Sequence, residues 1–145
     1  MAGRVLIIDD DPTHRRILEE MVKRSGLDVT SLDGASKALD LLSGAQAHGV
    51  KLIILDLIMP GMDGLDFLNR FQSVRNGVPV IVQTAQGSIE TVVRAMRAGA
   101  DDFVVKPISQ ERLRVSIQNL LKVTADAAQS AKPRPPTPSP GSSPT

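Results

Sequence analysis

Chemically useful polar side chains stand at the ends of short aliphatic runs in four places in the sequence. Each run has the length of a strand buried in a sheet. The runs and the residues that follow them are Arg4–Ile8 with Asp9 and Asp10, Leu52–Leu55 with Asp56, Val78–Val82 with Thr84, and Asp102–Val105 with Lys106. In a parallel sheet the carboxyl ends of the strands meet at one edge, where ligands bind. We therefore expect these five polar side chains to share one site.

The residue types indicate what such a site can do. Three carboxylates, those of Asp9, Asp10 and Asp56, repel one another unless a cation compensates their charge. An all-oxygen set that leaves positions for water suits Mg²⁺. Asp56 needs no base, because a carboxylate is ionised at neutral pH. It could attack a phosphoryl group in line to give an acyl phosphate, while the cation, Lys106 and the Thr84 hydroxyl stabilise the phosphoryl oxygens.

The aliphatic runs also predict the strands that position these polar residues. Uninterrupted aliphatic segments such as Leu52–Leu55 are typical of strands buried on both faces of a parallel sheet. A further strand is expected at Leu27–Leu32, where apolar and polar residues alternate as they do near a sheet edge. Residues 45 to 50 are expected to form a loop.

Five segments with helical apolar spacing alternate with the five strands. We expect Asp11 to cap the first helix with Pro12 at its first position, Gly26 to end it, and Ser109 to cap the last helix. The apolar positions are Ile17, Leu18, Met21 and Val22; Ala35, Ala38, Leu39 and Leu42; Leu65, Leu68 and Phe71; Ile89, Val92, Val93 and Met96; and Leu113, Ile117, Leu120 and Leu121. The alternation predicts an α/β fold, a doubly wound five-stranded parallel sheet with five helices on its two faces.

Composition limits the class of protein. The 145 residues are 41% hydrophobic and include no Cys, which excludes disulfides, thiolate catalysis and Cys-ligated zinc. No uncharged apolar run approaches the roughly 20 residues that span a bilayer, so we expect a soluble, cytoplasmic domain without membrane contact. The formal net charge is +1, and the tail accounts for it, which argues against direct nucleic-acid binding by the folded part.

The composition changes at Thr124. Six of the ten prolines lie between Pro133 and Pro144, mixed with Ser, Thr and Gly. Such a segment buries too little apolar surface to fold. We therefore expect a domain over residues 1–123 and a flexible linker or tail over residues 124–145, leading to a further domain.

The chain resembles a response-regulator receiver domain, the phosphoacceptor module of two-component signalling, over about Val5 to Val123. The resemblance rests on Asp-Asp after the first strand, Asp-x-x-Met-Pro-x-Met-Asp-Gly from Asp56, Thr-Ala after the fourth strand and Lys-Pro after the fifth. It implies a flavodoxin-like strand order 2-1-3-4-5. It also implies a signalling domain rather than an enzyme, phosphorylated by a sensor histidine kinase or a phosphotransfer protein.

The resemblance also assigns roles residue by residue. By this resemblance Asp56 is the phosphorylated residue, and Asp10, Asp56 and the backbone carbonyl of Ile58 bind Mg²⁺. Asp9 assists through metal-bound water. Thr84 contacts the phosphoryl group, and Lys106 pairs with the phosphoryl group. The peptide bond between Lys106 and Pro107 is expected to be cis.

Phosphorylation would add roughly two negative charges beside Asp56. Thr84 would swing toward them and leave space for Phe103 to rotate, although Phe103 as an ordinary core residue stays an open alternative. The surface affected would be the helix from Ser88 to Ala98, the strand 102–105 and the last helix, a face through which a homodimer is also conceivable. The segment Val92 to Pro107 is similar to receivers of the nitrogen-regulator type, which precede the effector domains of transcription activators.

Three rival functions are a phosphatase, an electron carrier and an interaction module. A haloacid-dehalogenase phosphatase would need a second Asp two residues after Asp56, where this chain has Ile58. A flavodoxin-like electron carrier would need a Ser/Thr-rich phosphate loop and aromatics, and this chain has three acids and no Trp or Tyr. An interaction module with an unused site stays open. His14 and His48 are expected to be exposed, and neither is assigned a function.

Overall fold

The computed structural model describes residues 3–44, 49–57, 63–75, 77–85 and 89–130. Within these ranges the chain forms a five-stranded sheet in the order β2-β1-β3-β4-β5, with every neighbouring pair parallel. The strands are β1 (Arg4–Ile8), β2 (Asp28–Leu32), β3 (Val50–Asp56), β4 (Val80–Thr84) and β5 (Asp102–Val105). The predicted fold class and strand order are confirmed.

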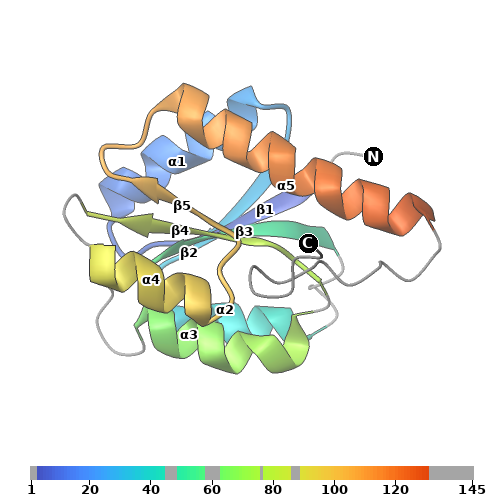
Figure 1. Ribbon diagram of the computed structural model, residues 1–145. Coiled ribbons are helices and arrows are strands. Elements are labelled where there is room, and N and C mark those ends of the chain that lie inside the picture. Colours follow the sequence, from blue (N-terminus) through green and yellow to red (C-terminus); the bar gives the residue numbers. More distant parts are fainter. Residues whose placement is uncertain (1–2, 45–48, 58–62, 76, 86–88, 131–145) are drawn as a thin grey trace, which may run out of the picture.

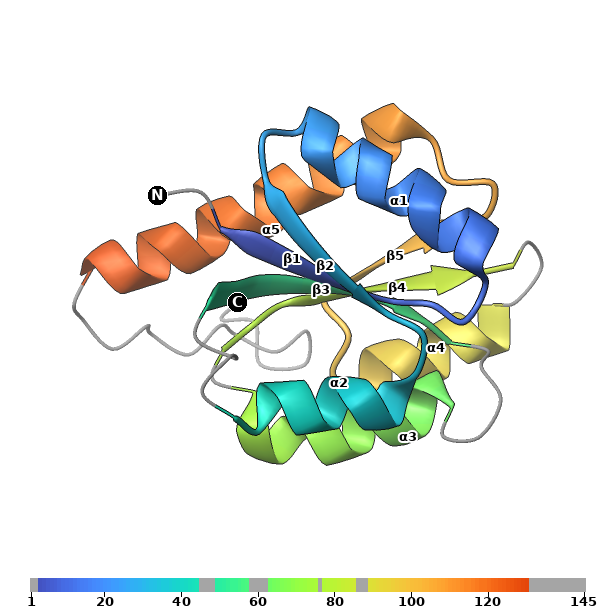
Figure 2. The same ribbon diagram turned by 180° about the vertical axis from the view of Figure 1, so that it is seen from behind.

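The α-helices of the described ranges connect the strands and cover both faces of the sheet. They are α1 (Pro12–Arg24), α2 (Ala35–Leu42), α3 (Gly64–Phe71), α4 (Ile89–Arg97) and α5 (Gln110–Ser130), and a short 3₁₀ helix, η2 (Gln72–Val74), follows α3. Helices α1 and α5 lie on one face and α2, α3 and α4 on the other (Figure 1). The reverse view shows the same three layers (Figure 2). None of the helices described is long and apolar enough to cross a membrane.

Local signals in the sequence set the helix ends. The Asp11 carboxylate accepts hydrogen bonds from two backbone N–H groups of the first turn of α1. Gly26, just past that helix, has a φ of 81°, which glycine adopts at little cost. Ser109 Oγ accepts a hydrogen bond from the N–H of Arg112 at the start of α5. The three predicted helix signals are confirmed.

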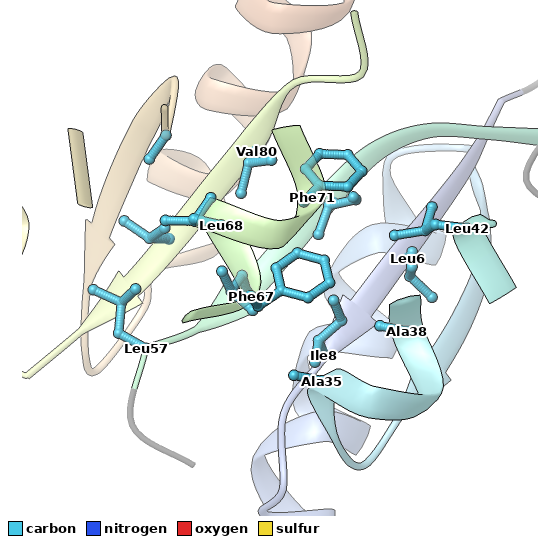
Figure 3. Packing of buried hydrophobic residues seen from close by; sticks show 14 of the residues in the cluster. Leu6, Ile8, Ala35, Ala38, Leu42, Leu57, Phe67, Leu68, Phe71 and Val80 are labelled. Carbon is cyan, nitrogen blue, oxygen red and sulfur yellow. The ribbon is translucent and has the colours of Figure 1, made fainter. Parts of the chain in front are cut away.

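Alternate residues of the central strands face opposite helical layers. Ile54 and Ile81 belong to the apolar cluster under α1 and α5, whereas Leu55 and Val82 belong to the cluster under α2, α3 and α4. Figure 3 shows the second cluster, in which Phe67 of α3 lies among side chains of β1, β3 and α2. Burial on both faces explains why these strands read as uninterrupted aliphatic runs.

Three strands begin at other residues than predicted, and the smallest difference is that β2 begins at Asp28 rather than Leu27. Val50, expected in a loop, is the first residue of β3 and pairs with Arg4. β4 begins at Val80 rather than Val78, because Pro79 has no N–H to donate to a neighbouring strand. The N–H of Val80 donates to the Asp101 carboxylate at 2.8 Å. At its other end, β4 includes Thr84 as its last residue.

The last helix extends past the predicted start of the tail at Thr124. The backbone of α5 is helical to Ser130. Residues 124–130 contain no Pro or Gly, and Ala and Gln favour a helix, so nothing local ends α5 at Thr124. The helix therefore continues into the segment predicted to be a linker or tail, and the domain boundary at residue 123 stays a prediction. The Pro-rich segment 131–145 lies outside the described residues.

Candidate functional site

The carboxyl ends of β1 and β3 bring three carboxylates together. One carboxylate oxygen from each of Asp9, Asp10 and Asp56 lies within 4.8 Å of the others. Asp9 and Asp56 are buried, and Asp10 is exposed. The two strands pair in parallel with Ile8 beside Leu55, so the residues that follow meet at the same edge of the sheet. The structure thus assembles the predicted acidic cluster.

The donor set of this cluster fits Mg²⁺. All three groups offer oxygen, the ligand that Mg²⁺ prefers, and the exposure of Asp10 leaves an open side for the waters that this ion retains. Negative charges this close also favour a bound cation, because their mutual repulsion is strong in a partly buried setting. The Ile58 carbonyl, the remaining predicted ligand, lies outside the described residues.

Asp9 has partners that the sequence analysis did not foresee. His14 Nδ1 lies 2.6 Å from Asp9 Oδ2, and the His14 side chain is only 19% exposed. The N–H of Asp11 donates to Asp9 Oδ1, and the Arg15 guanidinium donates to the Asp9 backbone carbonyl. The prediction of an isolated, exposed His14 is therefore wrong. Its place in the first turn of α1, directly behind the acidic pair, was the signal that could have indicated the contact; His48 lies outside the described residues.

Lys106 reaches the cluster from the far end of the sheet. Its Nζ lies 3.5 Å from Asp56 Oδ2, and its side chain is half-buried. The backbone N–H of Lys106 donates to the Thr84 carbonyl at 2.8 Å, which continues the β4–β5 pairing past the end of β5. The peptide bond between Lys106 and Pro107 is cis, as the resemblance implied. The structure therefore places the predicted lysine against the predicted phosphoacceptor.

Thr84 and Phe103 both line a cavity of about 170 Å³ beneath α4. The Thr84 hydroxyl is buried and donates to the Ala85 carbonyl at 3.3 Å. Phe103 is partly buried and packs against the cluster under α2, α3 and α4. The other lining residues are apolar and come from α4, from β5 and from Ala85, which follows β4. Space therefore exists on the α4 side of Thr84, next to the aromatic ring.

Two carboxylates near the face formed by α4, β5 and α5 pair within the chain. Asp102 binds Arg112 at 3.0 Å and accepts a hydrogen bond from Ser116. Partial burial tends to raise the pKa of Asp102, but the hydrogen bonds from Arg112, Ser116 and the Phe103 N–H outweigh it and hold that pKa below its usual value. Asp101 pairs with Arg75. These charges are satisfied without a second chain, so they give no support to a homodimer through this face.

Gly64 joins the end of β3 to the start of α3 at very close range. Its N–H donates to the Leu57 carbonyl at 3.0 Å. A Cβ added at Gly64 would lie 2.6 Å from Leu57 Cα and 2.9 Å from the Asp56 carbonyl oxygen. Both are backbone atoms, which cannot move aside as a flexible side chain can. The position of Asp56 therefore depends on a glycine at residue 64.

Gly64→Ala is expected to destabilise the fold by about 1 to 3 kcal/mol, the usual cost of overpacking. It should also slow phosphorylation, because the clash moves the backbone of Asp56. Urea denaturation and intact mass after incubation with acetyl phosphate measure the two effects. Gly34→Ala is the matched control, since a Cβ there meets nothing within 4 Å. Equal stability of the two variants would contradict the close approach.

Comparison with known proteins identifies the family of this chain. The family model of the response regulator receiver domain matches residues 5–118. The chain is 33% identical over 128 residues to the transcriptional regulatory protein FixJ of Bradyrhizobium diazoefficiens, with 88% of this chain and 61% of FixJ covered. It is 38% identical over 120 residues to the C4-dicarboxylate transport transcriptional regulatory protein DctD of Pseudomonas aeruginosa, with 83% and 25% covered.

Solved structures give the same result. NtrX from Brucella abortus superposes with a TM-score of 0.82 at 27% identity, over 90% of this chain and 29% of NtrX. A response regulator receiver protein from Pseudomonas putida superposes with a TM-score of 0.74 at 28% identity, over 82% of this chain and 98% of that chain. The chain belongs to the response-regulator receiver family. It spans 61% or less of the two curated relatives named above.

Proposed function

We propose that this receiver domain accepts a phosphoryl group on Asp56, in a reaction that depends on Mg²⁺, from a sensor histidine kinase or a phosphotransfer protein in the cytoplasm. One observation carries the proposal: the buried Asp56 carboxylate lies 3.5 Å from the Lys106 ammonium and within 4.8 Å of carboxylate oxygens of Asp9 and Asp10. A nucleophile, a fixed positive charge and a cation-binding set therefore converge at one strand end.

The transfer is a single displacement at phosphorus. An Asp56 carboxylate oxygen forms the new P–O bond while the bond between phosphorus and the donor breaks. The donor group, the imidazole nitrogen of a phosphohistidine or the acetate of acetyl phosphate, leaves with the bonding electron pair. Lys106 holds positive charge against the equatorial oxygens, and the Thr84 hydroxyl donates to one of them.

Asp10 and Asp56, with the carbonyl of Ile58, would hold the cation, and Asp9 would contact its bound water. When bound, Mg²⁺ supplies charge compensation for the phosphoryl oxygens and for the carboxylates themselves. Asp9 is held in position by the N–H of Asp11 and by His14, so its carboxylate has little freedom to turn away. The chain thus arranges its acidic groups before the phosphoryl donor arrives.

Phosphorylation would change the conformation of the face formed by α4, β5 and α5. Thr84 would turn toward the added charge, and Phe103 would move into the space on the α4 side of Thr84. FixJ and DctD carry the name of transcriptional regulatory proteins. We therefore propose that the readout controls an output domain, one that regulates transcription.

The test is the intact mass of the 145-residue protein after incubation with acetyl phosphate. With Mg²⁺ present, the expected result is a gain of one phosphoryl group per chain. With a chelator of divalent cations in place of Mg²⁺, the gain should disappear, because the acidic cluster is then uncompensated. No gain under either condition would favour an interaction module with an unused site, and an equal gain under both would refute the role of the cation.

A further inference from the structure

Gln83, in β4, is a fully buried polar side chain that the site described above does not use. Its relative exposure is 0%. Within the described part of the chain, neither Nε2 nor Oε1 of Gln83 has a hydrogen-bond partner. A buried amide without partners loses its hydration and gains nothing in return. Its presence directly after the aliphatic residues Val80–Val82 of β4 therefore requires an explanation.

The register of the sheet places Gln83 beside the phosphoacceptor. Gln83 is paired with Asp56 on β3 and with Val104 on β5. It follows Ile81 by two residues, so it shares the face of the sheet that is covered by α1 and α5. Asp56 follows Ile54 by two residues and lies on that same face. The Gln83 carboxamide and the Asp56 carboxylate are thus neighbours on adjacent strands.

The ion pair between Lys106 and Asp56 spans β4, the strand that carries Gln83. Asp56 ends β3 and Lys106 follows β5, and β4 lies between these two strands. Neighbouring strands lie about 5 Å apart, so the lysine side chain has to cross one whole strand to bring Nζ within 3.5 Å of Asp56. The strand it crosses carries Gln83 at the level of Asp56.

A carboxamide is suited to serve both members of that ion pair. Oε1 can only accept hydrogen bonds and an ammonium can only donate them, whereas Nε2 donates and a carboxylate oxygen accepts. A methionine has similar length and would fill the same space without any polar atom. The amide therefore offers the site a hydrogen-bonding capacity that an apolar residue of the same size lacks.

We propose that Gln83 is a positioning residue of the phosphoacceptor site. Once the phosphoryl group and the cation occupy the site, Oε1 of Gln83 accepts a hydrogen bond from the Lys106 ammonium. Its Nε2 then donates a hydrogen bond to an Asp56 carboxyl oxygen. This inference rests on the proposed function of Asp56. In the structure the Lys106 ammonium contacts the Asp56 carboxylate directly. During transfer Lys106 turns toward the phosphoryl oxygens, and the amide keeps both groups in line. Gln83 acts through Lys106 and Asp56 and touches neither the metal nor the phosphorus.

The test compares the natural protein with Gln83→Met. With acetyl phosphate and saturating Mg²⁺, the phosphorylation rate constant of the variant should fall at least about tenfold, because both hydrogen bonds of the amide are lost in the transition state. The Mg²⁺ concentration that gives half the maximal rate should not change, because Gln83 is not a ligand. Gln110→Met is the matched control, since Gln110 also has a buried Oε1 without partner and its Nε2 donates to the Met21 carbonyl. Its rate should equal that of the natural protein.

Thermal unfolding separates positioning from a purely structural role. In the empty protein Gln83→Met should raise Tm by roughly 3 °C, because it removes a buried amide without partners. The further rise in Tm on adding Mg²⁺ with beryllium fluoride, an analogue of the aspartyl phosphate, should be smaller in Gln83→Met than in the natural protein. Gln110→Met should show the full rise.

Two results would overturn the inference. A Gln83→Met rate equal to that of the natural protein would show that the loaded site does not use the amide. A lower Tm of the empty Gln83→Met protein would show that the amide already has a partner, such as a buried water, before loading. If the natural protein itself gains no phosphoryl group, the proposed function fails first and the role of Gln83 fails with it.

Discussion

The Asp56→Asn protein should gain no phosphoryl group from acetyl phosphate and Mg²⁺, whereas the natural protein gains one. An amide is neutral and a poor nucleophile, so the P–O bond cannot form at this position. The neighbouring carboxylates should not replace it: the Lys106 ammonium lies 3.5 Å from Asp56, Asp9 is held by His14 and the Asp11 N–H, and Asp10 is proposed as a ligand of the cation. Intact-mass measurement over time reports the loss directly.

The control for Asp56→Asn is Asp66→Asn, which removes an exposed carboxylate from the first turn of α3. It makes the same chemical change outside the acidic cluster and should leave phosphorylation intact. Asp56→Asn should itself stay folded, because the relief of repulsion from Asp9 and Asp10 offsets the loss of the ion pair with Lys106. A phosphoryl group on folded Asp56→Asn would place the acceptor elsewhere.

Phe67→Ala should destabilise the domain by about 3 to 5 kcal/mol. Phe67 is fully buried and stacks on Phe71, with ring centroids 5.4 Å apart. Phe67 projects from α3 toward β1 and α2 (Figure 3). Removal of its ring leaves a cavity among three packed elements, which can shift only partly to fill it. A small domain is stable by only about 5 to 15 kcal/mol, so the loss is a large fraction of the total.

Urea denaturation measures the loss of unfolding free energy in Phe67→Ala. The midpoint of the transition should fall, whereas the dependence of the unfolding free energy on urea concentration should stay similar. The control is Ile89→Ala, at a side chain that is 76% exposed on α4, which should change the unfolding free energy by less than about 0.5 kcal/mol. A comparable effect of the two substitutions would mean that α3 is not packed as described. Phosphorylation of the remaining folded Phe67→Ala protein should persist, because Phe67 lies on the α2–α3–α4 side of the sheet and Asp56 on the other.

Patterns within short stretches of the sequence were sufficient for the fold and for most of the candidate site. Uninterrupted aliphatic runs predicted buried parallel strands, and Asp11, Gly26 and Ser109 predicted helix ends, because these signals act over a few residues of backbone. Once the strands are parallel, the polar residues at their carboxyl ends must share one edge. The meeting of Asp9, Asp10, Asp56 and Lys106 follows from that rule and from spacing alone.

The tertiary structure decided which side chains meet across elements. The contact between His14 and Asp9 depends on the angle at which α1 leaves β1, and the start of β4 depends on the Asp101 carboxylate that accepts from Val80. Asp102 pairs with Arg112 within the chain because β5 and α5 pack together. The pairing of Gln83 with Asp56 depends on the strand order, since β4 lies between β3 and β5. Periodicity and caps are local and can be read from sequence, whereas register, strand order and packing angle join residues far apart in the chain and are set only when the whole core assembles.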